Sequence, residues 1–475
     1  MVQKHTRREF LTAIGASAAG LALAPYVLGE ESKPVRPNIL LITVDDMNWD
    51  SLGVTGCKIP GISPNIDALA KRGLRFEHAH LVSAVCQPSR SAAFTGRYPH
   101  RNGAMGFEPI RRDVPTLTES LRAGGYYNGI FSKVGHLAPL DKFCWDSVVK
   151  PSRLGEGRDP ALYYQHTKEF LREAKEAGKP FFLMVNSDDP HRPFPLLNGG
   201  GQGAPPTHIY RPEEVPVPGF LPKDVPDVKH ELAQYFTAVH RGDETVGQVM
   251  RALKEAGQDQ NTLVIFLSDN GMSFPFAKTN CYECSTRTPM IAVWPGKVKG
   301  GSLNADLVST VDLMATLLDA AGLPSVPGTD GHSILPLFKG AKQGAREDVF
   351  TFFSTTSANN SYPMRCVRNK RFSYIFNAWS DGETEFRNES MGGMAFRSMK
   401  AAAETDKKLA ERVNFYLRRT PEEFYDLASD PDELKNLIDD PKFKTEVEKM
   451  RKKVLKMMES TGDPVLPDFK KRIAY

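Results

Sequence analysis

The sequence is poor in cysteine, and its six cysteines do not form the dense framework of a disulfide-stabilised domain. They stand at positions 57, 86, 144, 281, 284 and 366. Cys281 and Cys284 make a lone C-x-x-C pair with no second pair at zinc spacing. A local disulfide or two free thiols therefore explain this pair better than a metal site does.

The net charge of the chain is small, and long apolar runs are few. A net charge of +4 at pH 7 is small for 475 residues, and there is no basic run or basic patch interleaved with aromatic residues. We therefore expect no nucleic-acid partner, although local positive potential can still attract a polyanionic substrate. There is no internal repeat or low-complexity tract, and the length predicts two or three domains with a large core.

The N-terminal segment has the form of a twin-arginine export signal. The sequence TRREFL at 6–11 precedes an apolar run at 14–23 that is rich in Ala and Gly. This run is far shorter than the ~20 residues that a membrane span needs, and no Cys follows it, so we expect no stable membrane anchor. We predict a signal peptide over 1–31, export by the twin-arginine machinery, and a periplasmic or secreted location. An ordinary N-terminal helix is the alternative.

The stretch LVSAVCQPSRSAAFTGR at 81–97 contains the strongest candidate for a reactive site. Cys86 lies just before a Pro near an expected helix start, where backbone N–H groups and the helix dipole favour negative charge. Arg90 is four residues on, over the same helix face, and Arg can bind sulfate or phosphate through a fork of N–H donors. The alternatives are a buried, unreactive thiol, and a thiol phosphatase, which would need a longer spacing from Cys to Arg.

Two predicted strands end in candidate metal ligands. The apolar run at 39–44 precedes two aspartates at 45–46, and the run at 262–268 precedes Asp-Asn-Gly at 269–271. Such runs are typical of strands buried on both faces of a parallel sheet, and open α/β sheets bind ligands at the carboxyl ends of their strands. Adjacent carboxylates repel each other unless a cation intervenes. A capping Asp beside a solvated Asp is the alternative.

Two more expected strands lead into basic and imidazole side chains. The strand at 126–131 precedes Lys133 and His136, and the strand at 180–187 precedes His191. His191 is held between two prolines on a stiff loop, which suits a positioned proton donor. A solvated Lys with a packed His, and a turn His without function, are the alternatives for these weak patterns.

Together these motifs resemble those of the type I, formylglycine-dependent sulfatases. The resemblance extends in order from residue 37 to residue 437 and includes C-x-P-S-R followed by T-G-R, and a late Y-D-L…D-P element. Within the family, the segments at 180–193 and 262–280, and H-x-N-G at 100–103, are most similar to heparan N-sulfatases (sulfamidases). Lys278 departs from this pattern, because sulfamidases carry Arg there. The K-x-x-H spacing is nearer to the iduronate-2-sulfatase pattern.

The resemblance implies two cofactors and a set of site residues. A maturation enzyme would oxidise Cys86 to formylglycine, whose hydrate attacks sulfur, and Ca²⁺ would bind beside it. Lys133 would hold a sulfate oxygen, His136 would bond and deprotonate the formylglycine hydroxyl, and His191 would protonate the leaving group. The implied metal ligands are Asp45, Asp46, Cys86, Asp269 and Asn270; the implied catalytic residues are Cys86, Arg90, Lys133, His136, His191 and Lys278; and the implied substrate-binding residues are Arg90, Lys133, His191, Lys278 and His100.

The resemblance also implies an α/β, alkaline-phosphatase-like fold. We expect a large, mixed and mostly parallel sheet flanked by helices over 35–345, and a smaller α+β domain with an antiparallel sheet over 346–475. The implied reaction removes sulfate from a sulfated glycan, with N-sulfoglucosamine of heparin or heparan sulfate favoured. The alternatives are an O-sulfatase of iduronate-2-sulfate or 6-O-sulfate type, a phosphodiesterase or phosphonate hydrolase of the same superfamily, and a glycan-binding protein with unconverted Cys86.

Helix patterns complete the expected layout. A helix after Ser63 should be capped by that residue and end at Gly73, and Thr116 with Glu119 has capping-box spacing. We expect His78, His80, His240 and Asp243 to serve packing or solvation. Further helices are expected at 168–177, 231–256, 309–321, 394–418 and 443–458.

Overall fold

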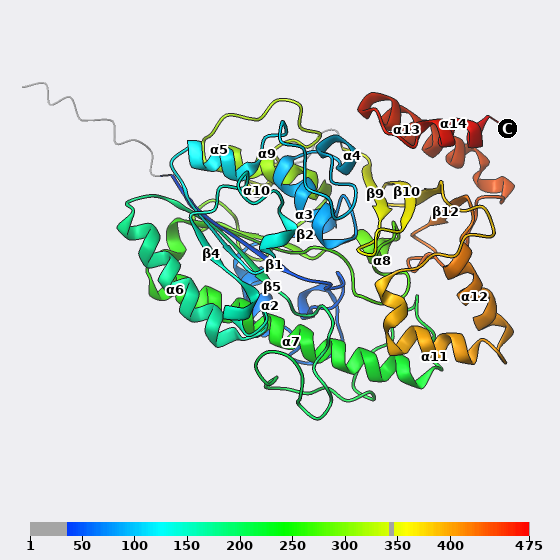
Figure 1. Ribbon diagram of the computed structural model, residues 1–475, viewed down its shortest axis with the longest axis horizontal. Helices are drawn as coiled ribbons and strands as arrows, with labels where there is room; N and C mark the ends of the chain where they lie inside the picture. Colours follow the sequence, from blue (N-terminus) through cyan, green and yellow to red (C-terminus); the bar gives the residue numbers. More distant parts are fainter. Residues whose placement is uncertain (1–35, 342–345, 475) are drawn as a thin grey trace, which may run out of the picture. The chain divides into compact units, whose positions relative to one another are not determined.

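The computed structural model describes residues 36–341 and 346–474, and its strands form two separate sheets (Figure 1). The central sheet has eight strands, in the spatial order β4 (Ser147–Val149), β3 (Tyr127–Phe131), β5 (Phe181–Ser187), β1 (Asn38–Val44), β6 (Thr262–Ser268), β7 (Met290–Val293), β2 (Leu74–His80) and β8 (Ser302–Ser309). The second sheet is antiparallel, in the order β12 (Glu422–Asp426), β11 (Phe372–Asn377), β10 (Ser361–Arg368) and β9 (Val349–Thr355). The predicted fold class is confirmed.

The central sheet is mostly parallel because β7 alone runs against its neighbours, β6 and β2. In the middle of the sheet, β1 lies between β5 and β6, and every residue of these three strands is buried. Their carboxyl ends meet at one edge. There, the Asp45 N–H donates to the carbonyls of Ser187 and Asp189 at 3.2 Å each, and the Asp269 N–H donates to Val44 at 3.2 Å. This edge positions the polar residues that follow each strand.

Helices cover both faces of the central sheet (Figure 1). Alternate side chains of β1 enter opposite cores: Leu40 and Ile42 face one, and Ile39 and Leu41 face the other. The α-helices of the whole described chain, and not only those on the central sheet, are α2 (Pro64–Arg72), α3 (Cys86–Thr95), α4 (Pro99–Asn102), α5 (Leu117–Ala123), α6 (Pro160–Glu176), α7 (Pro226–Glu255), α8 (Glu283–Thr286), α9 (Leu313–Ala320), α10 (Leu335–Phe338), α11 (Met394–Ala402), α12 (Lys407–Arg418), α13 (Lys444–Thr461) and α14 (Leu466–Ile473).

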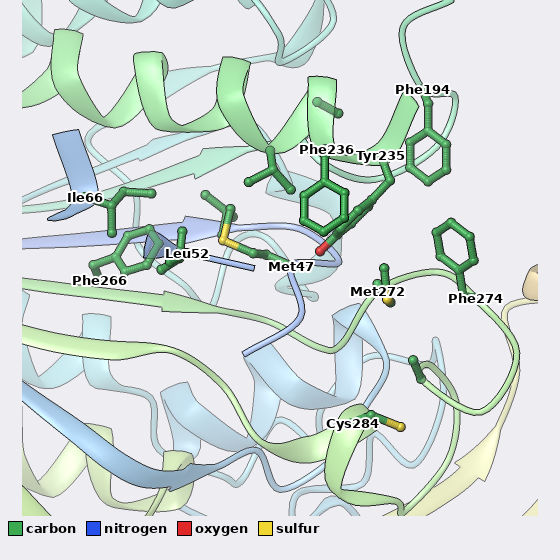
Figure 2. Close-up of a cluster of buried hydrophobic side chains, with 14 of the residues drawn as sticks. Met47, Leu52, Ile66, Phe194, Tyr235, Phe236, Phe266, Met272, Phe274 and Cys284 are labelled. Atoms are coloured by element: carbon green, nitrogen blue, oxygen red, sulfur yellow. The ribbon is translucent and has the colours of Figure 1, made fainter. Parts of the chain in front are cut away.

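The core on the α7 side reaches the end of the sheet where the strands stop. Figure 2 shows Tyr235 and Phe236 of α7 beside Met47, and Phe194 near Phe274. The Phe194 and Phe274 rings stack at 6.1 Å between centroids, and each is 5.9 Å from the Tyr235 ring. These aromatic contacts fix the loops that leave β1, β5 and β6.

The predicted capping box at α5 is confirmed: Thr116 accepts from the Glu119 N–H at 3.2 Å, and Glu119 accepts from the Thr116 N–H at 2.8 Å.

The residue predicted to cap the N-terminus of α2 was wrong. Ser63 stands at the N-cap position but makes no capping bond with its side chain. The Asp243 carboxylate of α7 accepts from the N–H groups of Asn65 at 3.1 Å and Ile66 at 2.7 Å instead. Asp243 is therefore a buried helix cap and not a solvated residue.

Several predicted boundaries also changed. The helix expected at 168–177 begins at Pro160, because Asp159 caps it by accepting from the Ala161 N–H at 2.9 Å. The segment predicted as one helix at 394–418 is divided into α11 and α12, the second capped by Asp406. The start of the helix expected at 309–321 is a 3-10 turn, Thr310–Asp312. Strands β2, β4, β8 and β12 were not predicted as strands.

The predicted signal peptide at 1–31 lies outside the described residues. Among the described helices, none combines the length and the apolar character that a membrane crossing requires. The described chain from Pro37 onward packs as a single unit, in which the Phe352 N–H of β9 donates to the Val82 carbonyl at 2.8 Å. The division into domains at 345 and 346 stays a prediction.

Candidate active site

Four oxygen-bearing side chains from the ends of β1 and β6 form the base of the site. Asp45, Asp46 and Asn270 are fully buried, and Asp269 is 2% exposed. Asp46 has a left-handed backbone with φ of 61°, and its N–H donates to Asp269 Oδ1 at 3.1 Å. Asn270 Nδ2 donates to Asp46 Oδ1 at 2.6 Å. The structure thus brings together the four predicted metal ligands of these two strands.

Cys86 is the first residue of α3, as predicted, and its side chain is buried among these carboxylates. Its sulfur belongs to one group of ligand atoms with Asp45 and Asp269, and to another with Asp46 and His191; in each group all atoms lie within 4.8 Å of one another. Burial raises the pKa of the Cys86 thiol well above its usual value; Lys278 opposes this shift, and the aspartates add to it. The unmodified thiol is therefore protonated, and this environment does not suit a thiolate nucleophile.

Arg90 lies one helical turn after Cys86 and is almost saturated by protein acceptors. Its Nη2 donates to Asp45 at 2.5 Å and to Asp269 at 2.9 Å. Its Nη1 donates to Thr43 Oγ1 at 2.9 Å and to Asn186 Oδ1. Only Nε lacks a hydrogen bond within the described residues. Arg90 therefore holds two carboxylates in place, and one N–H is left for an oxyanion.

Lys133 reaches the same carboxylate from the loop after β3. Its Nζ lies 2.5 Å from Asp45 Oδ2 and 3.2 Å from Asp188 Oδ2. Ser132 and Lys133 both have left-handed backbones, with φ of 55° and 46°, and Ser132 Oγ donates to Asp188 at 2.5 Å. Burial acts to raise the pKa of Asp45, but Lys133, followed by Arg90, lowers it well below its usual value. Asp45 is thus fully ionised.

His136 lies close to this lysine, in a short 3-10 turn, Val134–His136. Its ring meets the Phe107 ring edge-on at 6.1 Å, and its Nδ1 has no hydrogen bond within the described residues. Burial, followed by the charges of Lys133 and Arg90, lowers the pKa of His136 to about 3. His136 is therefore neutral near pH 7 and is suited to hydrogen bonding more than to proton abstraction.

Lys278 pairs with the second aspartate of the cluster, Asp46, whereas Lys133 pairs with Asp45. Lys278 is fully buried, and its Nζ lies 2.8 Å from Asp46 Oδ1 and also pairs with Glu389. Burial acts to lower the pKa of Lys278, but Asp46 raises it well above its usual value. Phe276 and Thr279 flank it with left-handed backbones, φ 70° and 58°. Such conformations are costly for residues other than Gly, and they cluster at functional sites.

His191 lies at the exposed side of the cluster, with its side chain 27% exposed and its Nε2 3.8 Å from Asp46 Oδ2. Its Nδ1 donates to the Arg192 carbonyl at 2.5 Å, so Nε2 is the nitrogen that faces the site. Arg158 anchors this loop by donating to the carbonyls of His191 at 3.1 Å and Arg192 at 3.3 Å. The geometry suits a fixed proton donor.

His100, a predicted substrate-binding residue, is not brought to this cluster. Its side chain is 3% exposed and lies 3.9 Å from Asp463, and its ring stacks with Tyr98 at 6.1 Å. The ring and charge contacts of the His100 side chain are with Tyr98, Phe352 and Asp463, which lie outside the cluster around Cys86. The structure also leaves both thiols of the C-x-x-C pair, Cys281 and Cys284, free and buried.

Four polar residues of the site were not predicted. Thr43 and Asn186 hold Arg90, Asp188 holds Lys133, and Glu389 holds Lys278. A signal existed for three of them, because a polar residue near the end of a buried apolar strand needs a partner. Glu389 comes from the C-terminal part of the chain, 116 positions from its neighbour Ser273, and no local pattern marks it.

The charges of the cluster do not balance within the protein. Five carboxylates face three cationic side chains, which gives an excess of two negative charges when every carboxylate is ionised. The carboxylates are Asp45, Asp46, Asp188, Asp269 and Glu389, and the cations are Arg90, Lys133 and Lys278. Burial, followed by the charge of Asp45, raises the pKa of Asp269, and Asn270 Oδ1 is buried without a hydrogen bond within the described residues. These hard oxygen ligands and this excess charge fit a divalent cation.

Comparisons with known proteins show similarity to sulfatases over most of the chain. The family model described as sulfatase matches residues 37–323, and one described as N-sulphoglucosamine sulphohydrolase, C-terminal, matches residues 272–388. The chain is 31% identical to N-sulphoglucosamine sulphohydrolase of Homo sapiens, covering 90% of this chain and 91% of that protein. It is 28% identical to an ulvan-active sulfatase of Formosa agariphila, covering 90% and 81%.

Two solved structures show the same fold. One, determined in complex with its substrate D-glucosamine-2-N,6-O-disulfate, has a TM-score of 0.69 at 18% identity and covers 91% of this chain and 99% of its own. The other, the phosphonate monoester hydrolase of Agrobacterium radiobacter, has a TM-score of 0.69 at 20% identity and covers 90% and 96%.

Proposed function

The chain belongs to the sulfatase family and is a hydrolase of sulfate esters or sulfamates, and we propose that it removes the N-sulfate of N-sulfoglucosamine in heparin or heparan sulfate. One observation carries the proposal: Cys86 at a helix start lies with Asp45, Asp46 and Asp269 in groups of close ligand atoms, and Lys133 and Lys278 pair with two of these aspartates. The sulfamidase relative and the matching C-terminal family model support the choice of an N-sulfated sugar.

We propose that Cys86 is converted to formylglycine by a maturation enzyme and that Ca²⁺ occupies the oxygen cluster. Asp45, Asp46, Asp269 and Asn270 would hold the ion together with the modified side chain at position 86. The hydrated aldehyde would supply the oxygen that attacks sulfur, and Ca²⁺ would polarise a sulfate oxygen. The protonated state of the unmodified thiol supports this assignment, because the residue as translated is a poor nucleophile here.

The basic side chains would bind and orient the sulfate group. Lys133 and Lys278 each place an ammonium at the cluster, where they offset the charge that develops on the sulfate oxygens. Arg90 fixes Asp45 and Asp269 and adds its positive charge to the cluster. His136, neutral near pH 7, would hydrogen-bond the hydroxyl at position 86.

His191 would protonate the leaving group. Its Nδ1–H is engaged by a backbone carbonyl, so the imidazole is held with Nε2 toward the site and with part of the ring exposed. An amine or alcohol leaves poorly as an anion, which makes a proton donor necessary. The donor must also lie where the sugar departs, and the partial exposure of His191 supports that placement.

A desulfation screen tests the substrate assignment. Matured enzyme is offered heparan disaccharides that carry one N-, 2-O- or 6-O-sulfate, and released sulfate is measured, with Cys86→Ala as the inactive control. We expect release from the N-sulfated sugar alone. Release of a 2-O- or 6-O-sulfate would replace this proposal by an O-sulfatase, which Lys278 and the Lys133/His136 spacing favour. Mass analysis of the peptide containing residue 86 reports its conversion independently.

We also propose that the protein is exported by the twin-arginine machinery to the periplasm or beyond. The paired arginines at positions 7 and 8 and the short apolar run after them support this location. Substitution of both arginines by lysine should retain the folded protein in the cytoplasm. Export that is unaffected by this substitution would contradict the proposal.

A further inference from the structure

The only acidic side chain that the C-terminal part of the described chain sends to the cluster is Glu389. It begins a 3-10 turn, Glu389–Gly392, which lies between the second sheet and α11. The turn is tied to the loop that carries Lys278, because Asn388 Nδ2 donates to Thr279 Oγ1 at 2.5 Å and Tyr416 OH donates to Asn388 Oδ1 at 2.9 Å. The residue before Glu389 is therefore held from two sides, by Thr279 and by Tyr416.

Glu389 differs from the aspartates of the cluster in its exposure. Its side chain is 32% exposed, while those of Asp45 and Asp46 are fully buried. His191 is 27% exposed, and Lys133 and Asp188 are 11% and 13% exposed. Glu389 is thus more exposed than any of these three, and Lys278, which it contacts, is fully buried. A sugar whose sulfate group reaches Lys278 would therefore extend past Glu389 toward solvent.

One carboxylate oxygen of Glu389 remains available at this position. Oε1 pairs with Lys278 and accepts from Ser273 Oγ at 3.4 Å. Oε2 has no hydrogen bond to any described residue. Burial acts to raise the pKa of Glu389, but Lys278, followed by His191, lowers it below its usual value. The group is therefore ionised near neutral pH, and it can accept hydrogen bonds but cannot donate them.

We propose that Glu389 is a specificity-determining residue that binds a hydroxyl or amino group of the sulfated sugar and rejects sugars carrying a second sulfate at that position. The inference rests on the proposed sulfatase function. An ionised carboxylate attracts O–H and N–H donors and repels a second anion, so one side chain selects for the donor and against its sulfated form. Glu389 also fixes Lys278, but that contact alone would affect all substrates equally.

The test compares kcat/KM across matched sugars. A monosulfated sugar that the wild-type enzyme cleaves is compared with the same sugar bearing a second sulfate at each other position, in wild type and in Glu389→Gln. We expect wild type to disfavour one disulfated sugar by tenfold or more, and Glu389→Gln to reduce that ratio about tenfold. Glu389→Asp keeps the negative charge but shortens the side chain, so its carboxylate lies farther from the sugar. This variant should give an intermediate ratio.

Two controls separate the outcomes. Glu404→Gln removes an exposed carboxylate elsewhere in the C-terminal region and should leave all ratios unchanged. A loss of kcat/KM by one common factor on every sugar in Glu389→Gln would reject the inference and leave Glu389 as a support for Lys278. Absence of sulfate release from every saccharide by matured wild-type enzyme would reject the proposed function itself. Melting temperatures confirm that each variant is folded.

Discussion

Calcium should stabilise the folded protein through its excess of buried negative charge. Asp45, Asp46 and Asp269 lie together at the ends of β1 and β6, and the cluster holds two more negative than positive side chains. A ligand that binds only the native state at a hundred times its Kd stabilises that state by about 2.7 kcal/mol. For a chain of this size we expect the melting temperature to rise by about 3 °C.

The assay is thermal unfolding of protein stripped with a chelator, followed by titration with Ca²⁺. Asp46→Asn removes one ligand and one charge, and it should reduce the rise to about 1 °C or less. Asp381→Asn, an exposed carboxylate outside the site, should retain the full rise. An unchanged melting temperature in the wild type, or the same rise in Asp46→Asn, would refute the charge argument. The measurement needs neither turnover nor a known substrate.

Three further predictions follow from single contacts. His191→Asn should lower kcat by 10²–10⁴ on a sugar sulfate but much less on nitrophenyl sulfate, whose leaving group needs no proton; equal losses on both would argue against an acid role. Asp243→Ala should lower the free energy of unfolding by about 1–2 kcal/mol in urea, because two N–H groups of α2 lose their acceptor, whereas Lys229→Ala on the same helix should not. Burial lowers the pKa of His80 to about 3, so the unfolded chain binds a proton that the folded chain does not, and stability should fall as pH drops from about 6.5 toward 3. His80→Gln should reduce that slope by about 1.4 kcal/mol per pH unit in acid-dependent unfolding; an unchanged slope would mean that other groups cause it.

The sequence predicted the centre of the sheet and the base of the site because both follow from local patterns. β1, β5 and β6 are continuous apolar runs, and residues buried on both faces of a parallel sheet must read in that way. Parallel strands bring their carboxyl ends to one edge, so the polar residues after β1 and β6 had to meet. Cys86 was predicted to lie beside these residues because its motif marks the start of a helix, and α3 begins at Cys86.

The features that sequence reasoning missed depend on distant partners. Ser63 has the residue type of a helix cap, but Asp243, from a helix far along the chain, occupies that role. β8 is half exposed and at the edge of the sheet, so its pattern is not that of a buried strand. Glu389 pairs with Lys278 only because the C-terminal turn folds back onto the loop after β6. No periodicity encodes such contacts.

The pairing of the two lysines couples the cation to the sulfate. Each ammonium has three N–H donors; Lys133 pairs with Asp45 and Asp188, and Lys278 pairs with Asp46 and Glu389. A divalent cation that binds Asp45 and Asp46 competes with the lysines for these carboxylates and so frees their N–H donors for sulfate oxygens. Because such coupling is reciprocal, sulfate should bind more tightly with Ca²⁺ present, and Ca²⁺ more tightly with sulfate present. Under this proposal, the lysines that pair with Asp45 and Asp46 in the metal-free cluster are the same ones that would bind the sulfate, which accounts for their position beside these two carboxylates.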